Sequence, residues 1–180
     1  MMEDAEKTGI FVEKMADFFR YNVKKGQEDA TLGEELEAVD NYIYILNVRF
    51  AGDIHFSKDV DESLENVRVP SMILQPIVEN AVNHGIRDIE WEGKIHLIVT
   101  GDADYIRISV KDNGKGMTPE QIEGVLSGNK EYRKEEGDST GIGMNNVISR
   151  LELYYEEKGL VEIRSDGLDR GTEVIVYIPV

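Results

Sequence analysis

Hydrophobic positions in the first fifty residues recur at helical spacing and predict two amphipathic helices. Between residues 3 and 25 the apolar side chains fall on one broad face, and Gly26 is expected to end that helix. Thr31 followed by Glu34 fits a capping box, and residues 32–50 then place apolar side chains at alternating steps of four and three. Because such a stripe needs a partner, we expect the two helices to form a hairpin, or half of a bundle shared between two chains.

From residue 51 the pattern becomes that of strands mixed with helices. Apolar and polar residues alternate strictly over residues 95–99 and 106–110, with a glycine turn between them, which predicts a β-hairpin. Residues 160–163 and 172–178 are a second pair of predicted strands, and a turn-rich link joins them.

Three further segments have helical spacing. The first surrounds residues 73–81 and is expected to be running or about to start at Pro70, and the others are residues 121–126 and 144–151. A short strand is expected around residues 54–56.

Together these elements predict a fold class and a domain organisation. Residues 1–50 form a helical segment, and residues 51–180 form an α+β domain in which a mixed sheet carries helices on one face. A chain of 180 residues can hold one good-sized domain with such an appendage, whereas two full domains are not expected.

The composition limits the kinds of partner. The formal net charge of −16 argues against a nucleic-acid groove, because affinity for phosphodiester backbones comes chiefly from clustered Lys and Arg. The absence of cysteine excludes disulfides and thiolate metal sites. No apolar run approaches the roughly 18 to 20 residues of a membrane span, so we expect a soluble protein.

Two polar side chains are candidates for a ligand site. Asn80 supplies a hard, neutral oxygen of the kind that Mg²⁺ accepts beside phosphates and water, although a lone Asn on a helix equally suits a cap or a solvated surface. Asp112 ends a predicted strand, and Gly114 and Gly116 then allow a flat ligand to approach closely; an ordinary Asp-Asn-Gly turn is the alternative. If the ligand is a purine, the Asp112 carboxylate favours adenine, whose exocyclic amine donates, over guanine, whose oxygen accepts.

A glycine pair is the third candidate feature. Gly141 and Gly143 precede the helix predicted from residue 144, so their N–H groups and the helix dipole could face phosphates. By itself a Gly-x-Gly before a helix is a weak signal.

In this order the candidate residues resemble a known set of motifs. The ATPase fold shared by DNA gyrase, MutL and histidine kinases carries N, G1, G2 and terminal Gly-Thr boxes, which are resembled by Asn80-Ala81, Asp112-x-Gly-x-Gly, Gly141-x-Gly143 and Gly171-Thr172. More narrowly, the chain from about residue 19 onward is similar to the catalytic region of two-component sensor histidine kinases of the LytS/YesM type. The segments that carry this similarity are Arg49-Phe50, Pro70, residues 74–81 and His84-Gly85.

The resemblance implies a fold, two cofactors and a set of binding residues. The fold is the Bergerat-type ATPase fold, a two-layer α/β sandwich, and the cofactors are ATP and Mg²⁺. Asp112 would hold adenine, with Thr172 assisting through water, and Asn80 would hold the metal. The implied ATP-binding residues are Asn80, Asn83, His84, Asp112, Gly114, Lys115, Gly116, Met117, Thr140, Gly141, Ile142, Gly143, Met144 and Thr172.

The implied function is that of the ATP-binding catalytic domain of a sensor histidine kinase. Such a domain transfers the γ-phosphoryl of Mg-ATP to a phosphoacceptor His, for relay to a response regulator. The family carries that His in a Pro-His-Phe motif, which is absent here. No catalytic residue is therefore assigned, and we expect the acceptor to lie upstream of this fragment, which alone should not autophosphorylate.

The resemblance also implies partners and a location. The partners are the upstream phosphoacceptor and dimerisation domain of the same protein and a response regulator. The full-length protein is expected to be a homodimer. We expect this domain to be cytoplasmic and its parent to be anchored in the bacterial plasma membrane.

Two other functions stay open. Hydrolases and serine kinases on the same fold carry a Glu four residues before the metal-binding Asn, and Pro76 at that position favours the kinase. A nucleotide-binding dimerisation or scaffold module without kinase activity is the second.

Three details of the resemblance bear on phosphate contact and catalysis. Asn83 departs from the family because a Lys is often found there. Glu79 could polarise an incoming imidazole or simply lie on the helix surface. Lys130, Arg133 and Lys134 match the family's ATP lid in position, where a solvated loop is the alternative.

Overall fold

The protein forms a mixed five-stranded sheet with helices on one face. The structure is a computed structural model that describes residues 2–24, 29–50, 54–87, 89–128 and 140–180. The sheet order is β2-β4-β5-β7-β6, in which β2 pairs with β4 in parallel and the other neighbours pair antiparallel. These strands are β2 (Ile54–Val60), β4 (Gly93–Gly101), β5 (Tyr105–Asp112), β6 (Val161–Arg164) and β7 (Glu173–Pro179).

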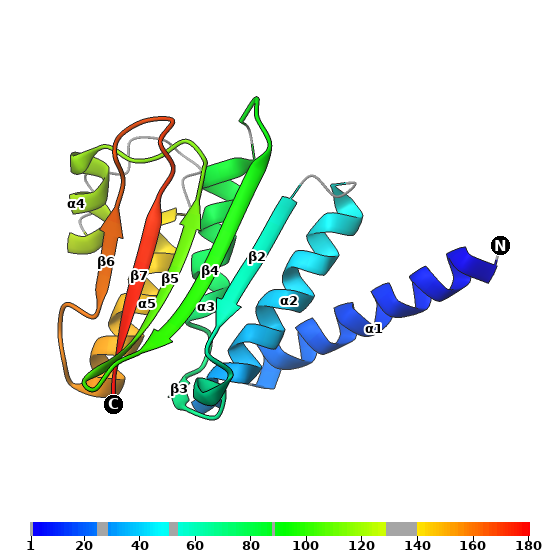
Figure 1. Cartoon of the computed structure of the whole chain (residues 1–180), viewed down its shortest axis with the longest axis horizontal. Helices are drawn as coiled ribbons and strands as arrows, with labels where there is room; N and C mark the ends of the chain where they lie inside the picture. The colour runs from blue at the N-terminus through cyan, green and yellow to red at the C-terminus, as the bar shows by residue number, and fades with distance from the viewer. Residues whose placement is uncertain (1, 25–28, 51–53, 88, 129–139) are drawn as a thin grey trace.

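In the view of Figure 1, α3 and α5 lie behind the sheet, α2 lies beside β2, and α1 projects away from the body of the molecule. A second, two-stranded sheet pairs β1 (Asp29–Thr31) with β3 (Arg68–Pro70). The helices are α1 (Met2–Lys24), α2 (Leu32–Arg49), the 3-10 helix η1 (Glu62–Leu64), α3 (Leu74–Asn80), the π-helix η2 (Ala81–Ile86), α4 (Pro119–Ser127) and α5 (Thr140–Tyr155). The predicted α+β class and the predicted hairpins are confirmed.

Side-chain caps fix where two of the helices begin. At the start of α2, Thr31 Oγ1 accepts from Glu34 N at 3.2 Å and Glu34 Oε2 accepts from Thr31 N at 2.8 Å, which is the predicted capping box. At the start of α4, Thr118 and Gln121 form a second reciprocal pair. Each box satisfies two backbone N–H groups that a helix N-terminus would otherwise leave without partners.

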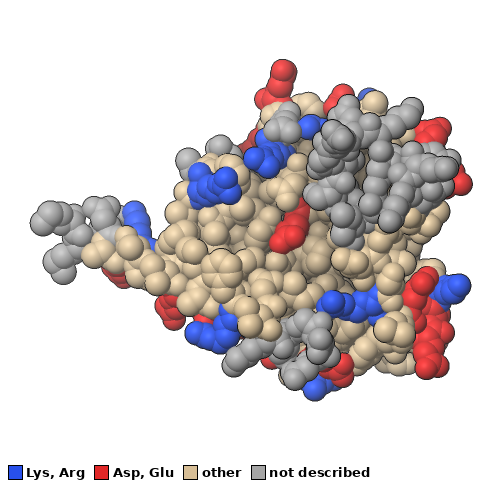
Figure 2. All heavy atoms as spheres, turned by 180° about the vertical axis from the view of Figure 1, so that it is seen from behind, with Lys and Arg blue, Asp and Glu red and all other residues tan. Residues whose placement is uncertain are grey.

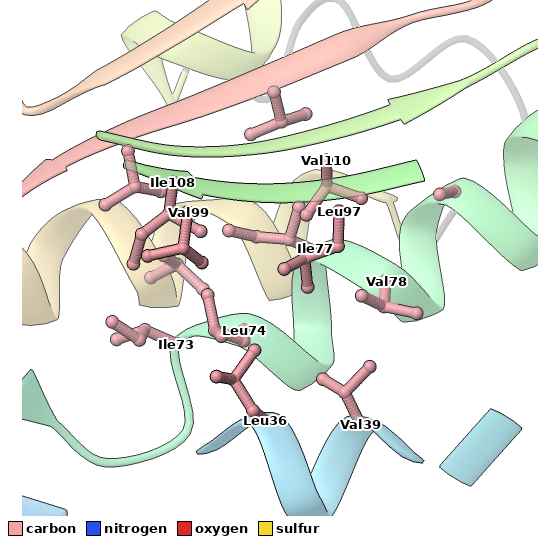
Figure 3. Packing of buried hydrophobic residues seen from close by; sticks show 14 of the residues in the cluster. Leu36, Val39, Ile73, Leu74, Ile77, Val78, Leu97, Val99, Ile108 and Val110 are labelled. Carbon is pink, nitrogen blue, oxygen red and sulfur yellow. The ribbon is translucent and has the colours of Figure 1, made fainter. Parts of the chain in front are cut away.

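The core lies between the sheet and α3. Because side chains alternate along a strand, β4 buries Leu97 and Val99 on the same face on which β5 buries Ile108 and Val110. Figure 3 shows these four side chains facing the apolar side of α3. The close packing places α3 firmly against the middle of the sheet.

Helix α2 adds a further layer to this core. Its Leu36 and Val39 are buried and, in Figure 3, point from α2 toward α3, with Leu36 facing the buried Leu74. Helix α3 is therefore packed between the sheet on one side and α2 on the other.

Three local expectations differ from the structure. Pro70 belongs to β3, so the helix starts later, at Leu74. That helix does not continue as a regular α-helix beyond Asn80 but becomes the π-helix η2. Strand β2 is longer than the two or three residues expected, because its outer positions are solvated and lack the apolar alternation that marks a strand in the sequence.

In Figure 2, which shows the opposite face from Figure 1, charged side chains gather mainly around the rim. Within the described ranges, no helix combines the length and hydropathy that would be needed to span a membrane.

Two leucines on α5 give a matched test of this packing. Leu151 is fully buried whereas Leu153 is 84% exposed. Leu151→Ala should lower the free energy of unfolding in urea by about 2 to 5 kcal/mol, since it leaves a cavity in the core. Leu153→Ala should change it by no more than about 0.5 kcal/mol. Equal losses in the two variants would contradict the packing described.

Candidate functional site

Asp112, the last residue of β5, is the buried carboxylate of the site. Its Oδ1 accepts hydrogen bonds from Gly114 N at 2.8 Å and from Thr172 N at 3.3 Å. The backbone N of Asp112 donates to Thr172 O at 2.9 Å. The strand end, the glycine turn and the start of β7 are thus joined around one side chain, which is 5% exposed.

The glycine turn lies directly against the π-helix. Gly114 is so close to Gly85 that a Cβ on Gly114 would lie 2.1 Å from Gly85 O. Lys115 N donates to that same carbonyl at 3.0 Å, and a Cβ on Gly85 would lie 2.8 Å from Asp112 Oδ1. Only glycine permits these approaches, so the predicted His84-Gly85 and Asp112-x-Gly-x-Gly motifs meet in space.

The loop before β7 closes the other side of the turn. Gly171 adopts φ +76°, and a Cβ there would lie 2.1 Å from Asp112 O. Gly116 adopts φ +66° and approaches Gly167 in the same way. Ser165 fastens this loop, because its hydroxyl oxygen accepts from Met117 N at 3.0 Å and its O–H group donates to Gly171 O at 2.7 Å.

Burial raises the pKa of the Asp112 carboxyl from 3.8 to about 6. The hydrogen bonds from Gly114 and Thr172 act in the opposite direction, but they do not offset the loss of hydration. A carboxylate that is costly to bury is typical of a functional site. At neutral pH Asp112 is nevertheless ionised and able to accept a hydrogen bond from a ligand.

Asn80 lies at the C-terminal end of α3, facing the first turn of α5. A Cβ on Gly143 would lie 3.9 Å from both Asn80 Nδ2 and Asn80 Oδ1. Within the part of the chain that the structure describes, the buried Nδ2 of Asn80 has no hydrogen-bond partner. A buried N–H donor normally has an acceptor, so the Asn80 amide nitrogen fits a ligand that supplies an acceptor oxygen, such as a phosphate.

The remaining predicted residues are placed as follows. Gly141 and Gly143 are in the first turn of α5 rather than before it, together with Thr140 and Ile142. The Met144 side chain is buried in the core, so only its backbone could contact a ligand. The other predicted residues are the half-buried His84, Lys115, Gly116 and Met117 and the exposed Asn83. Lys130, Arg133 and Lys134 lie outside the described residues.

Several contacts of the site escaped the sequence analysis. Trp91 Nε1 donates to Asn113 O at 2.9 Å, and the Asn113 side chain bonds Lys94 N and Glu92 O. Gln75 Nε2 donates to Glu79 Oε1 at 2.7 Å, one turn along α3. The Gln75–Glu79 spacing of four was a readable signal, whereas no local pattern links Trp91 or Ser165 to the turn at Asp112.

The described side chains do not form a metal site that is complete without a ligand. Among residues the structure describes, no group of three or more His, Asp or Glu side chains is placed to hold a metal ion.

Family models and curated relatives match this chain over most of its length. The family model "Histidine kinase-, DNA gyrase B-, and HSP90-like ATPase" matches residues 67–180, and the model "Histidine kinase" matches residues 1–54. Sensor histidine kinase YpdA of Escherichia coli (strain K12) is 36% identical over 167 residues, which are 90% of this chain and 27% of that protein. Sensor protein LytS of Bacillus subtilis (strain 168) is 28% identical over 177 residues, which are 98% of this chain and 29% of that protein. The chain thus spans less than a third of the length of these curated relatives.

Solved structures share the fold. The catalytic domain of histidine kinase ThkA has a TM-score of 0.58 and 22% identity, and the match covers 85% of this chain and 98% of that one. Mycobacterial sensor histidine kinase MprB has a TM-score of 0.61 and 17% identity, and the match covers 84% of this chain and 96% of that one. These likenesses confirm the predicted two-layer fold.

The raised pKa of Asp112 predicts how stability depends on pH. The unfolded chain loses this proton near pH 3.8 and the folded chain near pH 6, so between these values the folded state binds more protons. The contribution of Asp112 to the free energy of unfolding is therefore full below pH 3.8, and it falls by about 1.4 kcal/mol per pH unit up to pH 6.

Asp112→Asn isolates this effect, because an amide oxygen can still accept from Gly114 N and Thr172 N but does not titrate. The difference in unfolding free energy, variant minus wild type, should rise between pH 4 and pH 7 in urea titrations. A difference that is independent of pH would contradict the burial described.

Proposed function

The chain belongs to the family of histidine kinase-, DNA gyrase B- and HSP90-like ATPases, and we propose that it is the ATP-binding catalytic domain of a sensor histidine kinase. In this role it transfers the γ-phosphoryl of Mg-ATP to a phosphoacceptor His that lies outside this chain. The observation that carries the proposal is the buried carboxylate of Asp112, enclosed where Gly85, Gly114 and Gly171 allow three segments of the chain to come into close contact.

Asp112 is proposed to select the base. Both backbone donors, Gly114 N and Thr172 N, bond to Oδ1, which leaves Oδ2 as the oxygen to accept from a ligand. The exocyclic amine of adenine donates to such an oxygen, whereas guanine presents an acceptor at the same place. Thr172 supports the carboxylate through its backbone N–H, and a water-mediated contact to the base is the role that the family implies for it.

Asn80 and the first turn of α5 are proposed to receive the phosphates. Asn80 would hold Mg²⁺ through its amide oxygen, with the rest of the shell supplied by phosphate and water. When bound, the ion neutralises phosphate charge during phosphoryl transfer. The turn at Gly141 and Gly143 presents backbone N–H groups at the positive end of α5. His84, Lys115 and Asn83 are further candidates for contact with the nucleotide.

Glu79 is proposed to polarise the incoming imidazole. It precedes Asn80 directly, and the hydrogen bond from Gln75 Nε2 at 2.7 Å orients its carboxylate. The hydrolase alternative is disfavoured because Pro76 occupies the position from which a Glu would activate water, one turn before Asn80.

The partners and location are proposed on the same basis. The acceptor His would belong to an upstream dimerisation domain of a longer, homodimeric parent, and a response regulator would receive the phosphoryl group. Residues 1–50 would complete the dimerisation region and residues 51–180 the ATPase domain. We further propose that this domain is cytoplasmic in a parent held at the plasma membrane, and that its charge of −16 disfavours nucleic acid.

Nucleotide titration tests the role of Asp112. Calorimetric titration at pH 7.5 with Mg²⁺ should give ATP an affinity about 10-fold to 100-fold above that of GTP, since guanine would leave the buried carboxylate without a donor. Asp112→Asn should weaken ATP binding by a similar factor. Asp104→Asn, an exposed aspartate at the opposite end of β5, is the matched control and should bind like wild type. Equal affinity for ATP and GTP would contradict the assignment.

Phosphoryl transfer tests the kinase role separately. The chain should transfer label from γ-labelled Mg-ATP to an added segment that bears the acceptor His of a related kinase, and the product should be acid-labile. If ATP binds but no acid-labile phosphate forms, the non-catalytic scaffold function is favoured instead.

A further inference from the structure

A buried glutamate from α2 caps the helix that carries Asn80. Glu35 is 1% exposed, and its carboxylate accepts from Met72 N at 2.6 Å, Ile73 N at 2.9 Å and Leu74 N at 2.8 Å. The Tyr21 hydroxyl of α1 donates to Glu35 Oε1 as well. Both carboxylate oxygens are therefore engaged by donors from two separate parts of the chain, α1 and the turn before α3.

The turn before α3 is shaped to receive this carboxylate. Met72 adopts the left-handed region at φ +63°, and Ile73 follows in the right-handed helical region. Successive residues of opposite hand point their N–H groups into one concavity, which binds an anion. Helix α3 has no side-chain cap of its own, because its N-cap residue is Ile73. Glu35 thus supplies from α2 the cap that the local sequence lacks.

The same turn is held from the other side by α5. The Arg150 guanidinium donates to the carbonyl oxygen of Ser71, the residue before Met72. Helix α5 also presents Gly143 to Asn80. The turn is accordingly fixed between α2 and the helix whose first turn completes the candidate phosphate site.

Helix α3 transmits the position of this turn to Asn80. The helix has seven residues, from Leu74 at the cap to Asn80 at the other end, which is about 10 Å at 1.5 Å per residue. Leu74, Ile77 and Val78 are buried between α2 and the sheet, so the helix can shift only as a unit. The position of the N-terminus of α3, along and around the helix axis, therefore determines where the Asn80 amide lies.

We infer that Glu35 is a positioning residue for the Mg-ATP site, which it serves by fixing the N-terminus of α3 and hence the Asn80 amide. This inference rests on the proposed function. Through Tyr21 the same carboxylate also links α1 to the site, and the stacking of Phe18 on Tyr42, with ring centroids 5.9 Å apart, fastens α1 to α2 nearby. A change in the placement of α1 would therefore shift Asn80 through the hydrogen bond between Tyr21 and Glu35.

A glutamine at position 35 is the informative substitution. It keeps the volume of the side chain but has a single acceptor oxygen, and its amide group would direct N–H toward backbone N–H donors. Glu37→Gln is the matched control, because Glu37 lies on the same helix and is exposed.

The test measures ATP affinity with and without Mg²⁺. Glu35→Gln should weaken ATP binding in Mg²⁺ by about tenfold, as expected when a group that orients a metal ligand is lost. Binding in EDTA, which depends on Asp112 and the base, should change by less than about twofold. Glu37→Gln should match wild type in both conditions. Unchanged affinity in Mg²⁺, or equal weakening in both conditions, would overturn the inference.

A second variant covers the case in which Glu35→Gln fails to fold. Tyr21→Phe removes one donor to Glu35 and keeps the ring, so it should weaken binding in Mg²⁺ selectively and by less than Glu35→Gln. A folded Tyr21→Phe variant with wild-type affinity in Mg²⁺ would overturn the inference that Glu35 and its partner Tyr21 position Asn80. If wild type itself fails to bind Mg-ATP, or if Asp112→Asn binds like wild type, it is the proposed function that fails.

Discussion

The close approach of three glycine backbones around one buried carboxylate is the constraint on which the site depends. Gly85, Gly114 and Gly171 come from the π-helix, the turn after β5 and the loop before β7, and each lies where a Cβ would meet backbone or Asp112. Their approach brings together segments nearly ninety residues apart, roughly the separation of Gly85 and Gly171. Because no side chain intervenes, the turn can enclose a carboxylate and still leave one of its oxygens for a ligand.

The N-terminal segment, residues 1–50, contributes to the same site by packing against the helix that carries Asn80. Leu36 and Val39 of α2 pack on α3, and β1 pairs with β3 immediately before the turn at Met72. The N-box helix is thus held by the sheet on one side, by α2 on the other and by Glu35 at its start. A protein built in this way can couple the placement of its first helices to the geometry of Asn80 through direct contacts.

The sequence predicted most of the fold, and the reasons for its failures are physical. Strict alternation marked β4 and β5, and the capping box at Thr31 marked the start of α2, because these signals are local. Strand β3 was not predicted, since a three-residue strand has too few positions to show alternation, and the helix expected to be running or about to start at Pro70 begins at Leu74. The candidate site was predicted as motifs, and the structure brings Asp112, Gly85 and Gly114 together. The hydrogen bonds of Ile73 to Glu35 and of Met117 to Ser165 were missed, because each joins residues more than thirty positions apart in sequence and depends on tertiary packing.

The central claim is that Asn80 and Asp112 serve opposite ends of one bound nucleotide. The most direct measurement is the paramagnetic broadening of amide signals in the isotope-labelled chain when ATP is added with a trace of Mn²⁺ in place of Mg²⁺. The account predicts that broadening is strongest at the Asn80 side-chain amide and the Gly143 N–H, weaker at Gly114, and absent without ATP. Broadening that is strongest away from α3 and α5, or that is the same with and without ATP, would contradict it.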